Sequence, residues 1–192
     1  TPASNCGLVG LKPSRGRNPT GPHAPDVWWG FIGEHAVSRT VRDSAALLDA
    51  TAGDYPQQLM KLPAPERPFL EETRRDAGRM RIAFSYDPGL GKALHPENRK
   101  ALEATAARLD RLGHEVVEVH LPLPPETFLE CYASLISADV AATLRMASTI
   151  VGREATSDDV ELATWILAKM GEAQSAADVA SSLWTMQTFS RQ

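Results

Sequence analysis

The sequence predicts an α/β fold, with a strand–helix–strand unit at residues 81–121 and a helical part over residues 123–192. The stretches RIAFSYD (81–87) and HEVVEVHLP (114–122) are short runs rich in β-branched and aromatic residues. An amphipathic stretch separates them, and such a unit of about forty residues favours parallel pairing with a right-handed crossover. The residues that follow are apolar at helical spacing, and a content of 43% hydrophobic residues is typical of a globular chain.

The first fifty residues combine irregular backbone with one helix. Residues 10–35 are rich in glycine and proline, which predicts loops around one or two short strands. Helical spacing then begins, with Thr40 and Asp43 at capping-box spacing and Gly53 at the expected end. In this helix we expect Leu47 and Leu48 to face the core.

The crossover helix of the central unit is expected within residues 95–113. Pro96 suits the first helical turn, and Gly113 follows the last one. One apolar stripe is predicted along this helix, made of Leu102, Ala106, Leu109 and Leu112.

Three further helices are expected after it. The first is long, opened by Pro125 and broken by Gly152. The second is predicted from about Ser157 to Met170, with Asp158 and Asp159 near its start, where acidic side chains complement the helix dipole. The third begins near Ser175, which has capping-box spacing to Asp178, and its predicted buried face carries Val179, Leu183 and Met186.

These elements lead us to expect a single incomplete domain over residues 1–192. Its predicted parts are loops and a helix at 1–53, a proline-punctuated connector at 54–80, the strand–helix–strand unit at 81–122 and the helical part at 123–192. No internal repeat divides the chain differently.

Charge and cysteine content narrow the possible partners. The formal net charge is −4, and the arginines near residue 75 alternate with acidic residues, so no nucleic-acid partner is expected. No stretch reaches the continuous apolar length of a bilayer span, so no membrane partner is expected either. Cys6 and Cys131 lie too far apart in sequence to suggest a disulfide framework, and a reduced, cytoplasmic setting fits best.

The residues show no catalytic or metal-binding constellation by themselves. The five histidines, His23, His35, His95, His114 and His120, lack metal-ligand spacing, so neither a metal nor another cofactor is expected. No G-x-S-x-G elbow or S-x-x-K pair is present. Cys6 stands among apolar residues, which favours a small buried thiol, and Cys131 is expected to pack on its helix with a lesser chance of lining a pocket.

The opening stretch TPASNCGLVGLKPSRGR nevertheless resembles the tail of the amidase signature, the motif of a family of serine amidases. The matching positions are Pro2, Ala3, Cys6, Gly7, Gly10, Lys12, Pro13, Ser14, Gly16 and Arg17. A second segment of the family motif is matched by Arg39 and Asp43, with Ser38 inserted. The strand–helix–strand unit is similar to the one that commonly follows, and the overall pattern looks closest to the branch that includes 6-aminohexanoate cyclic-dimer hydrolases.

This resemblance implies hydrolysis of amide bonds by a Ser–cis-Ser–Lys triad. In such a triad a neutral lysine accepts the serine proton through a second serine, while backbone amides hold the oxyanion. The motif places the nucleophile three residues before Thr1, so the chain is expected to be the central fragment of an amidase and inactive alone. Lys12 and Ser14 belong to the motif's turn rather than to the triad.

The resemblance also implies a small-molecule amide substrate and contacts with the remaining amidase segments, or self-association through exposed core. Pocket candidates are Trp28, Trp29, Phe31, Cys131 and Tyr132, although apolar packing explains each of them equally well. The alternatives are a non-catalytic module of the same fold and one component of a glutamyl-tRNA amidotransferase. A protease-trimmed product and a deliberately cut piece are equally open origins for the chain.

Overall fold

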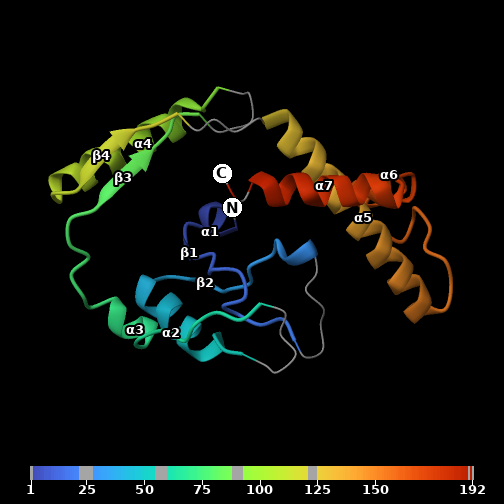
Figure 1. The fold of residues 1–192 in the computed structure, drawn as a ribbon, viewed down its shortest axis with the longest axis horizontal. Coiled ribbons are helices and arrows are strands. Elements are labelled where there is room, and N and C mark those ends of the chain that lie inside the picture. The colour runs from blue at the N-terminus through green and yellow to red at the C-terminus, as the bar shows by residue number, and fades with distance from the viewer. Residues whose placement is uncertain are drawn as a thin grey trace. The chain divides into compact units, whose positions relative to one another are not determined.

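The computed structural model describes residues 2–21, 28–54, 60–87, 93–120, 125–189 and 191. The chain divides into two compact units, residues 1–76 and 77–192 (Figure 1). Sequence predictions that concern Thr1, Pro22, His23, Pro25, Pro56 and Pro122 lie outside the described residues.

The first unit contains a pair of short strands, with a short helix before them and a 3₁₀ turn between them. Strands β1 (Val9–Gly10) and β2 (Val37–Ser38) are antiparallel, with Val9 opposite Ser38. Helix α1 (Pro2–Cys6) precedes β1, and a 3₁₀ turn occupies Trp28–Gly30. The prediction of loops around one or two short strands is therefore confirmed for β1, whereas β2 lies just after the predicted range and α1 was missed.

Helix α2 (Val41–Thr51) follows the predicted cap. The Thr40 side chain accepts a hydrogen bond from the Asp43 backbone N–H at 3.0 Å, as the capping-box spacing indicates. The buried face consists of Ser44, Ala45 and Leu48. Leu47 is 40% exposed, so its predicted core position is wrong, because a turn of about 100° per residue directs Leu47 away from Leu48.

The predicted connector holds a short helix, α3 (Phe69–Glu72), which sequence reasoning missed. The Asp49 carboxylate on α2 accepts hydrogen bonds from the backbone N–H groups of Phe69 (2.6 Å) and Leu70 (2.9 Å). These N–H groups have no partner within the helix, and a carboxylate satisfies them well. A side chain about twenty residues earlier in the sequence thus fixes where α3 begins.

The strand–helix–strand unit is confirmed. Strands β3 (Arg81–Phe84) and β4 (Glu115–Glu118) pair in parallel, with Arg81 opposite Glu115, and helix α4 (Pro96–Arg111) connects them. His95 caps α4 by accepting from the Glu97 N–H at 3.3 Å, which agrees with its expected place at a helix start. The stripe is shorter than predicted, since Leu112 follows the helix and is 66% exposed.

The rest of the second unit is helical: α5 (Pro125–Val151), α6 (Leu162–Glu172) and α7 (Ala176–Phe189). Helices α6 and α7 both pack on α5 (Figure 1). The closest approach is at Gly171 of α6, where an added Cβ would overlap the Ser137 carbonyl of α5. A polar cluster supports this crossing: Gln174 Nε2 donates to the Ser137 hydroxyl at 2.8 Å, and the Ser134 hydroxyl donates to Gln174. Ser137 is only 1% exposed, so its hydroxyl depends on these partners.

Helix α7 begins as predicted. Ser175 and Asp178 bond reciprocally: the Asp178 N–H donates to Ser175 Oγ at 3.2 Å, and the Ser175 N–H donates to Asp178 Oδ2 at 2.9 Å. The Ser175 bonds hold the pKa of Asp178 below its usual value. Met186 is buried and the other two residues of the predicted face are half-buried.

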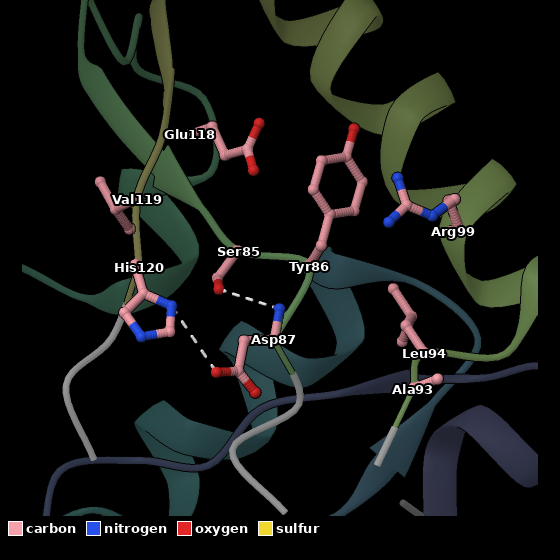
Figure 2. Close-up of a pocket in the computed structure, with 9 residues that line it drawn as sticks. All are labelled: Ser85, Tyr86, Asp87, Ala93, Leu94, Arg99, Glu118, Val119 and His120. Carbon is pink, nitrogen blue, oxygen red and sulfur yellow. Dashed lines mark hydrogen bonds and ion pairs between the residues drawn. The ribbon is translucent and has the colours of Figure 1, made fainter. Parts of the chain in front are cut away.

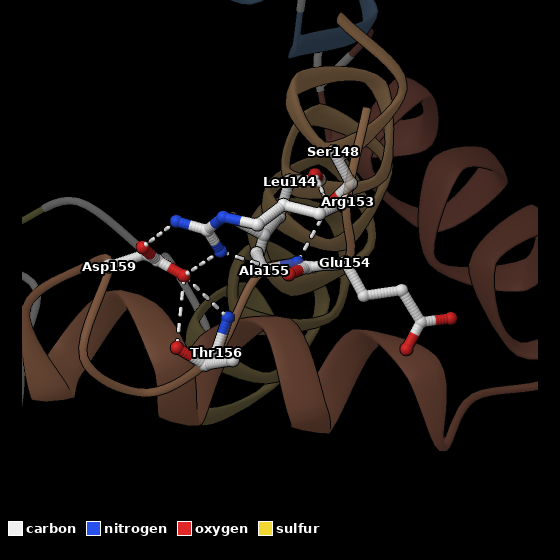
Figure 3. A network of polar contacts seen from close by, with 7 residues as sticks. All are labelled: Leu144, Ser148, Arg153, Glu154, Ala155, Thr156 and Asp159. Carbon is white, nitrogen blue, oxygen red and sulfur yellow. Dashed lines mark hydrogen bonds and ion pairs between the residues drawn. The ribbon is translucent and has the colours of Figure 1, made fainter. Parts of the chain in front are cut away.

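The prediction that the next-to-last helix starts at about Ser157 is wrong, because α6 begins at Leu162. In the preceding loop, Asp159 accepts two hydrogen bonds from the Arg153 guanidinium, at 2.5 and 2.7 Å (Figure 3). It also accepts from the Thr156 N–H and hydroxyl at 2.8 and 2.9 Å. A carboxylate engaged in this way holds a turn, so the acidic pair does not serve the helix dipole as expected.

We expect the Asp159 contacts in this loop to stabilise the fold in a way that depends on pH. Hydrogen bonds from Arg153 and Thr156 hold the pKa of Asp159 well below its usual range. A lowered pKa in the folded state stabilises above the unfolded pKa of about 3.9, and this stabilisation is lost as the pH falls further. Asp159→Asn is expected to lower the urea midpoint at pH 7, with a deficit that shrinks below pH 4. Asp158→Asn is the control and should leave the midpoint unchanged at both pH values.

The length and composition of helix α5 differ from the sequence prediction that no segment could span a membrane. Among the described residues, Glu126–Val151 forms one helix that is long and apolar enough to cross a bilayer by length and composition. The sequence prediction that no stretch approaches this length is therefore wrong. Core helices of soluble proteins meet the same test, so the finding alone assigns no membrane role.

Candidate functional site

The signature-like residues form one continuous structure in the first unit. Helix α1 leads through Gly7 into β1, where an ideal Cβ on Gly10 would lie 2.7 Å from the Ala3 Cβ. Such a contact is too short for two carbon atoms, so glycine at position 10 is what allows α1 to pack on β1. The fixed spacing of the motif therefore has a steric reason here.

The following segment makes a tight turn. The Arg17 N–H donates to the Ser14 carbonyl at 2.9 Å, and Gly16 in between has a φ of 79°, which glycine adopts without strain. Pro13 is buried. Arg17 donates to the Pro63 carbonyl at 2.9 Å, and its guanidinium lies 5.7 Å from the Phe69 ring centroid. Arg17 thus anchors the motif to the segment around α3.

Lys12 is bound to backbone rather than to a serine. Its Nζ donates to the Pro13 carbonyl at 2.8 Å. Among the hydrogen bonds of the described residues, none joins Lys12 to a hydroxyl group. This geometry supports the interpretation that Lys12 belongs to the motif's turn.

A hollow of about 620 Å³ lies along these residues. Its walls come from α1, β1 and the chain that leads into β2, and they are mostly apolar, with one ammonium group and one imidazole. The lining residues are Pro2, Ala3, Ser4, Leu8, Gly10, Leu11, Lys12, Gly33, His35, Ala36 and Val37. Four of the predicted signature positions therefore face one cavity.

His35 is a residue of this hollow that sequence reasoning treated as ordinary. Its Nε2 lies 3.1 Å from both the carbonyl and the hydroxyl oxygen of Ser44 on α2. It is half-buried, so it ties the wall of the hollow to a core helix. No sequence motif marks this pairing, because it depends on how the chain before β2 folds back on α2.

Arg39 and Asp43 are separate from the hollow. Arg39 is exposed, and Asp43 contributes its backbone N–H to the cap of α2. Among the described residues, no hydrogen bond or ion pair joins Arg39 to Asp43.

The first group of pocket candidates lies in the 3₁₀ turn and just after it. Trp28 and Trp29 have positive φ values of 53° and 58°, and Trp29 is 43% exposed. The Phe31 ring lies 5.0 Å from the guanidinium carbon of Arg15. None of the three lines the hollow described above.

The cysteines and Tyr132 have different surroundings. Cys6, the last residue of α1, is exposed, so its prediction as a buried thiol is wrong. Cys131 is buried, as expected. Tyr132, its neighbour on α5, is 44% exposed, and its ring stacks on Phe128 at 5.8 Å. Cys131 and Tyr132 belong to the second unit, whereas the tryptophans belong to the first.

A second hollow, of about 910 Å³, lies at the carboxyl ends of β3 and β4 (Figure 2). There His120 Nδ1 lies 3.7 Å from Asp87 Oδ2, and the Arg99 guanidinium carbon lies 4.0 Å from the Tyr86 ring centroid. Burial and nearby Glu103 raise the pKa of Tyr86. Most of the lining residues are polar, and all of them are exposed or half-buried. Within the described ranges no group of three side chains could hold a metal ion.

Comparisons with known proteins place this geometry in a family. The model of the family described as Amidase matches residues 1–188. The chain is 35% identical over 175 residues to the 6-aminohexanoate-cyclic-dimer hydrolase of Paenarthrobacter ureafaciens, which covers 89% of this chain and 36% of the relative. It is also 35% identical over 162 residues to a subunit of the glutamyl-tRNA(Gln) amidotransferase of Thermus thermophilus. This match covers 83% of this chain and 33% of the relative.

Solved structures agree with the sequence comparisons. A structure of 6-aminohexanoate cyclic dimer hydrolase superimposes with a TM-score of 0.87 at 32% identity and covers 98% of this chain. The same enzyme has been solved in complex with its substrate. This chain spans 40% of that enzyme's structure and 36% of the curated hydrolase. The α/β fold and the signature resemblance are thereby confirmed, and the chain belongs to the Amidase family.

Proposed function

We propose that this chain forms the central part of a hydrolase that cleaves carbon–nitrogen amide bonds with a Ser–cis-Ser–Lys triad. The observation that carries the proposal is the signature tail folded along one hollow, in a chain that matches an amide hydrolase over 98% of its length. The role of this part is to shape the pocket wall. The nucleophile belongs to the motif segment that precedes the tail, so the chain alone is inactive.

The proposed substrate is a small, uncharged amide handled in the cytoplasm. Its support is the relative that carries the name 6-aminohexanoate-cyclic-dimer hydrolase, together with the largely apolar walls of the hollow. Such walls favour methylene groups over charged ligands.

The test compares the chain alone with the chain joined to an upstream amidase segment that supplies the G-G-S part of the motif and to a downstream segment. Release of free amine from the 6-aminohexanoate cyclic dimer is expected only from the joined form. The serine-to-alanine variant of that form is the control for background hydrolysis. A joined form that folds and cleaves no amide in a panel of cyclic, linear and aryl substrates would refute the proposal.

A second candidate is the role of a glutamyl-tRNA amidotransferase component, which the 35% identity to the Thermus thermophilus protein favours. It predicts glutamine hydrolysis that depends on partner chains of the amidotransferase. The amine-release assay distinguishes the two candidate functions. An amidotransferase component should cleave glutamine in preference to the cyclic dimer, and the proposed hydrolase should cleave the cyclic dimer.

We also propose that the helices of the second unit pack on further amidase segments or on another copy. Large apolar side chains on α5, α6 and α7 are strongly exposed: Ile150 (78%), Leu162 (72%), Trp184 (67%) and Val151 (66%). Apolar area of this kind favours association. The isolated chain is expected to elute as an oligomer or aggregate with light-scattering detection, and a stable, monodisperse monomer would contradict this.

A further inference from the structure

The turn at Trp28–Gly30 carries an unusual backbone. Three consecutive residues have left-handed φ values: 53° at Trp28, 58° at Trp29 and 73° at Gly30. Glycine adopts this conformation freely, whereas for a bulky side chain it is a genuine outlier, because the Cβ crowds the following carbonyl. The two tryptophans therefore occupy positions that the backbone would leave to glycine or asparagine.

Neighbouring contacts fix the turn against the signature tail. The Phe31 N–H donates to the Trp28 carbonyl at 2.9 Å, and the Phe31 ring lies under Arg15 of the Ser14–Arg17 turn. An ideal Cβ on Gly30 would lie 3.7 Å from Arg15 Cδ. Three residues further along, Gly33 lines the signature hollow. The turn and the wall of the hollow thus belong to one loop that is tied to the motif.

Packing accounts for one tryptophan better than for the other. Trp28 is half-buried, so contacts of its indole offset part of its strain. Trp29 keeps 43% of its surface exposed and therefore gains less from burial within its own unit. Strained backbone at ligand-binding positions persists where the side chain is needed for binding.

We propose that Trp29, which lies on the same loop as Gly33 but outside the lining of the hollow, is a specificity-determining residue, whose exposed indole face contacts the part of an uncharged aliphatic amide that extends beyond the hollow. The proposal rests on the proposed amide hydrolase function and names a side chain for its substrate preference. An indole offers a large, flat, rigid surface, on which methylene groups and the amide plane pack with little loss of conformational freedom. Short amides such as acetamide lack the methylene chain and gain little from it.

The test uses Trp29→Gly and Trp29→Phe, with Leu112→Ala after α4 as the control for loss of an exposed apolar side chain. Glycine relieves the strain and removes the ring, so the urea midpoint of Trp29→Gly is expected to rise. In the joined amidase form, KM for the cyclic dimer should increase about tenfold with kcat nearly unchanged, while kinetics on acetamide stay within about twofold. Trp29→Phe keeps both the strain and an aromatic face, so its midpoint and KM should stay close to wild type. Leu112→Ala should leave the kinetics on both substrates unchanged.

Two results would overturn the assignment. A lower midpoint for Trp29→Gly, with equal losses on both substrates, would show that the indole serves packing. A higher midpoint with unchanged KM for the cyclic dimer would show that the strain has no role in substrate choice. If the wild-type joined form cleaves no amide, both the proposed function and the assignment of Trp29 are refuted. If the wild-type joined form cleaves the cyclic dimer and Trp29→Gly has the same KM, only the assignment of Trp29 is refuted.

Discussion

A Gly171→Ala variant is expected to lose most of the packing between α5 and α6. The added methyl group would overlap the Ser137 carbonyl, which is backbone and cannot rotate away as a flexible side chain could. The helices must therefore separate, and separation also breaks the hydrogen bonds of Gln174 to Ser134 and Ser137. Overpacking and the loss of a buried polar cluster each cost about 1–3 kcal/mol, so we expect a combined destabilisation of about 3 kcal/mol or more.

Two other glycines provide matched controls for this measurement. Gly152 has a φ of 79° with nothing near its ideal Cβ, so Gly152→Ala should show backbone strain alone, about 1 kcal/mol. Gly53 has open space and no positive φ, so Gly53→Ala should change stability little. The urea midpoint and the helical circular dichroism signal report the order. Equal midpoints for Gly171→Ala and Gly152→Ala would contradict the steric argument.

The isolated chain is expected to remain unlabelled by a fluorophosphonate, a probe that reacts with activated serines. Among the described serines, only Ser44 is bonded to a basic side chain, that of His35, and Ser44 is 3% exposed, so the probe has no access to it. Lys12 is bound to a backbone carbonyl instead. In the joined amidase form the probe should label one serine, in the G-G-S segment. Replacing that serine by alanine should lower kcat by at least about 10³-fold, as for other serine hydrolases.

Lys12→Ala in the joined form tests whether Lys12 is structural. Its ammonium donates only to the Pro13 carbonyl among the described bonds, so hydrolysis should fall by far less than for the serine variant, with labelling retained. Mass spectrometry of the labelled peptide locates the modified serine. A labelled serine within residues 1–192 would mean that this chain carries a nucleophile of its own.

Local signals in the sequence predicted much of the fold. The caps at Thr40 and Ser175, the break at Gly152 and the parallel β3–β4 unit depend on neighbours within a few residues or on one repeated pattern. Helix α3 and the start of α6 depend instead on side chains outside these windows. Asp49 caps α3 from about twenty residues away, and Arg153 draws Asp159 into a loop that the sequence alone presents as a helix start.

The candidate site shows the same division. Fixed glycine and proline spacing identified the signature tail, and Gly10 and Gly16 are required there by close contact and by a positive φ. The role of His35 depends on the fold of the chain before β2. The left-handed conformation of Trp28 and Trp29 was not predictable, because bulky residues normally avoid it.

The hydrogen bonds between the Asp49 carboxylate and the start of α3 also affect how the protein responds to proteases. Asp49 on α2 accepts hydrogen bonds from Phe69 and Leu70, and Arg17 donates one to the Pro63 carbonyl. The chain on either side of the segment between residues 49 and 63 is therefore also linked by noncovalent contacts. Lys61 is exposed within this segment. A single tryptic cut after Lys61 would leave two polypeptides that still travel together on a sizing column and separate only in denaturant. We therefore expect the peptide bond at this point to be dispensable for cohesion, so that the gene can be divided here into two co-expressed halves.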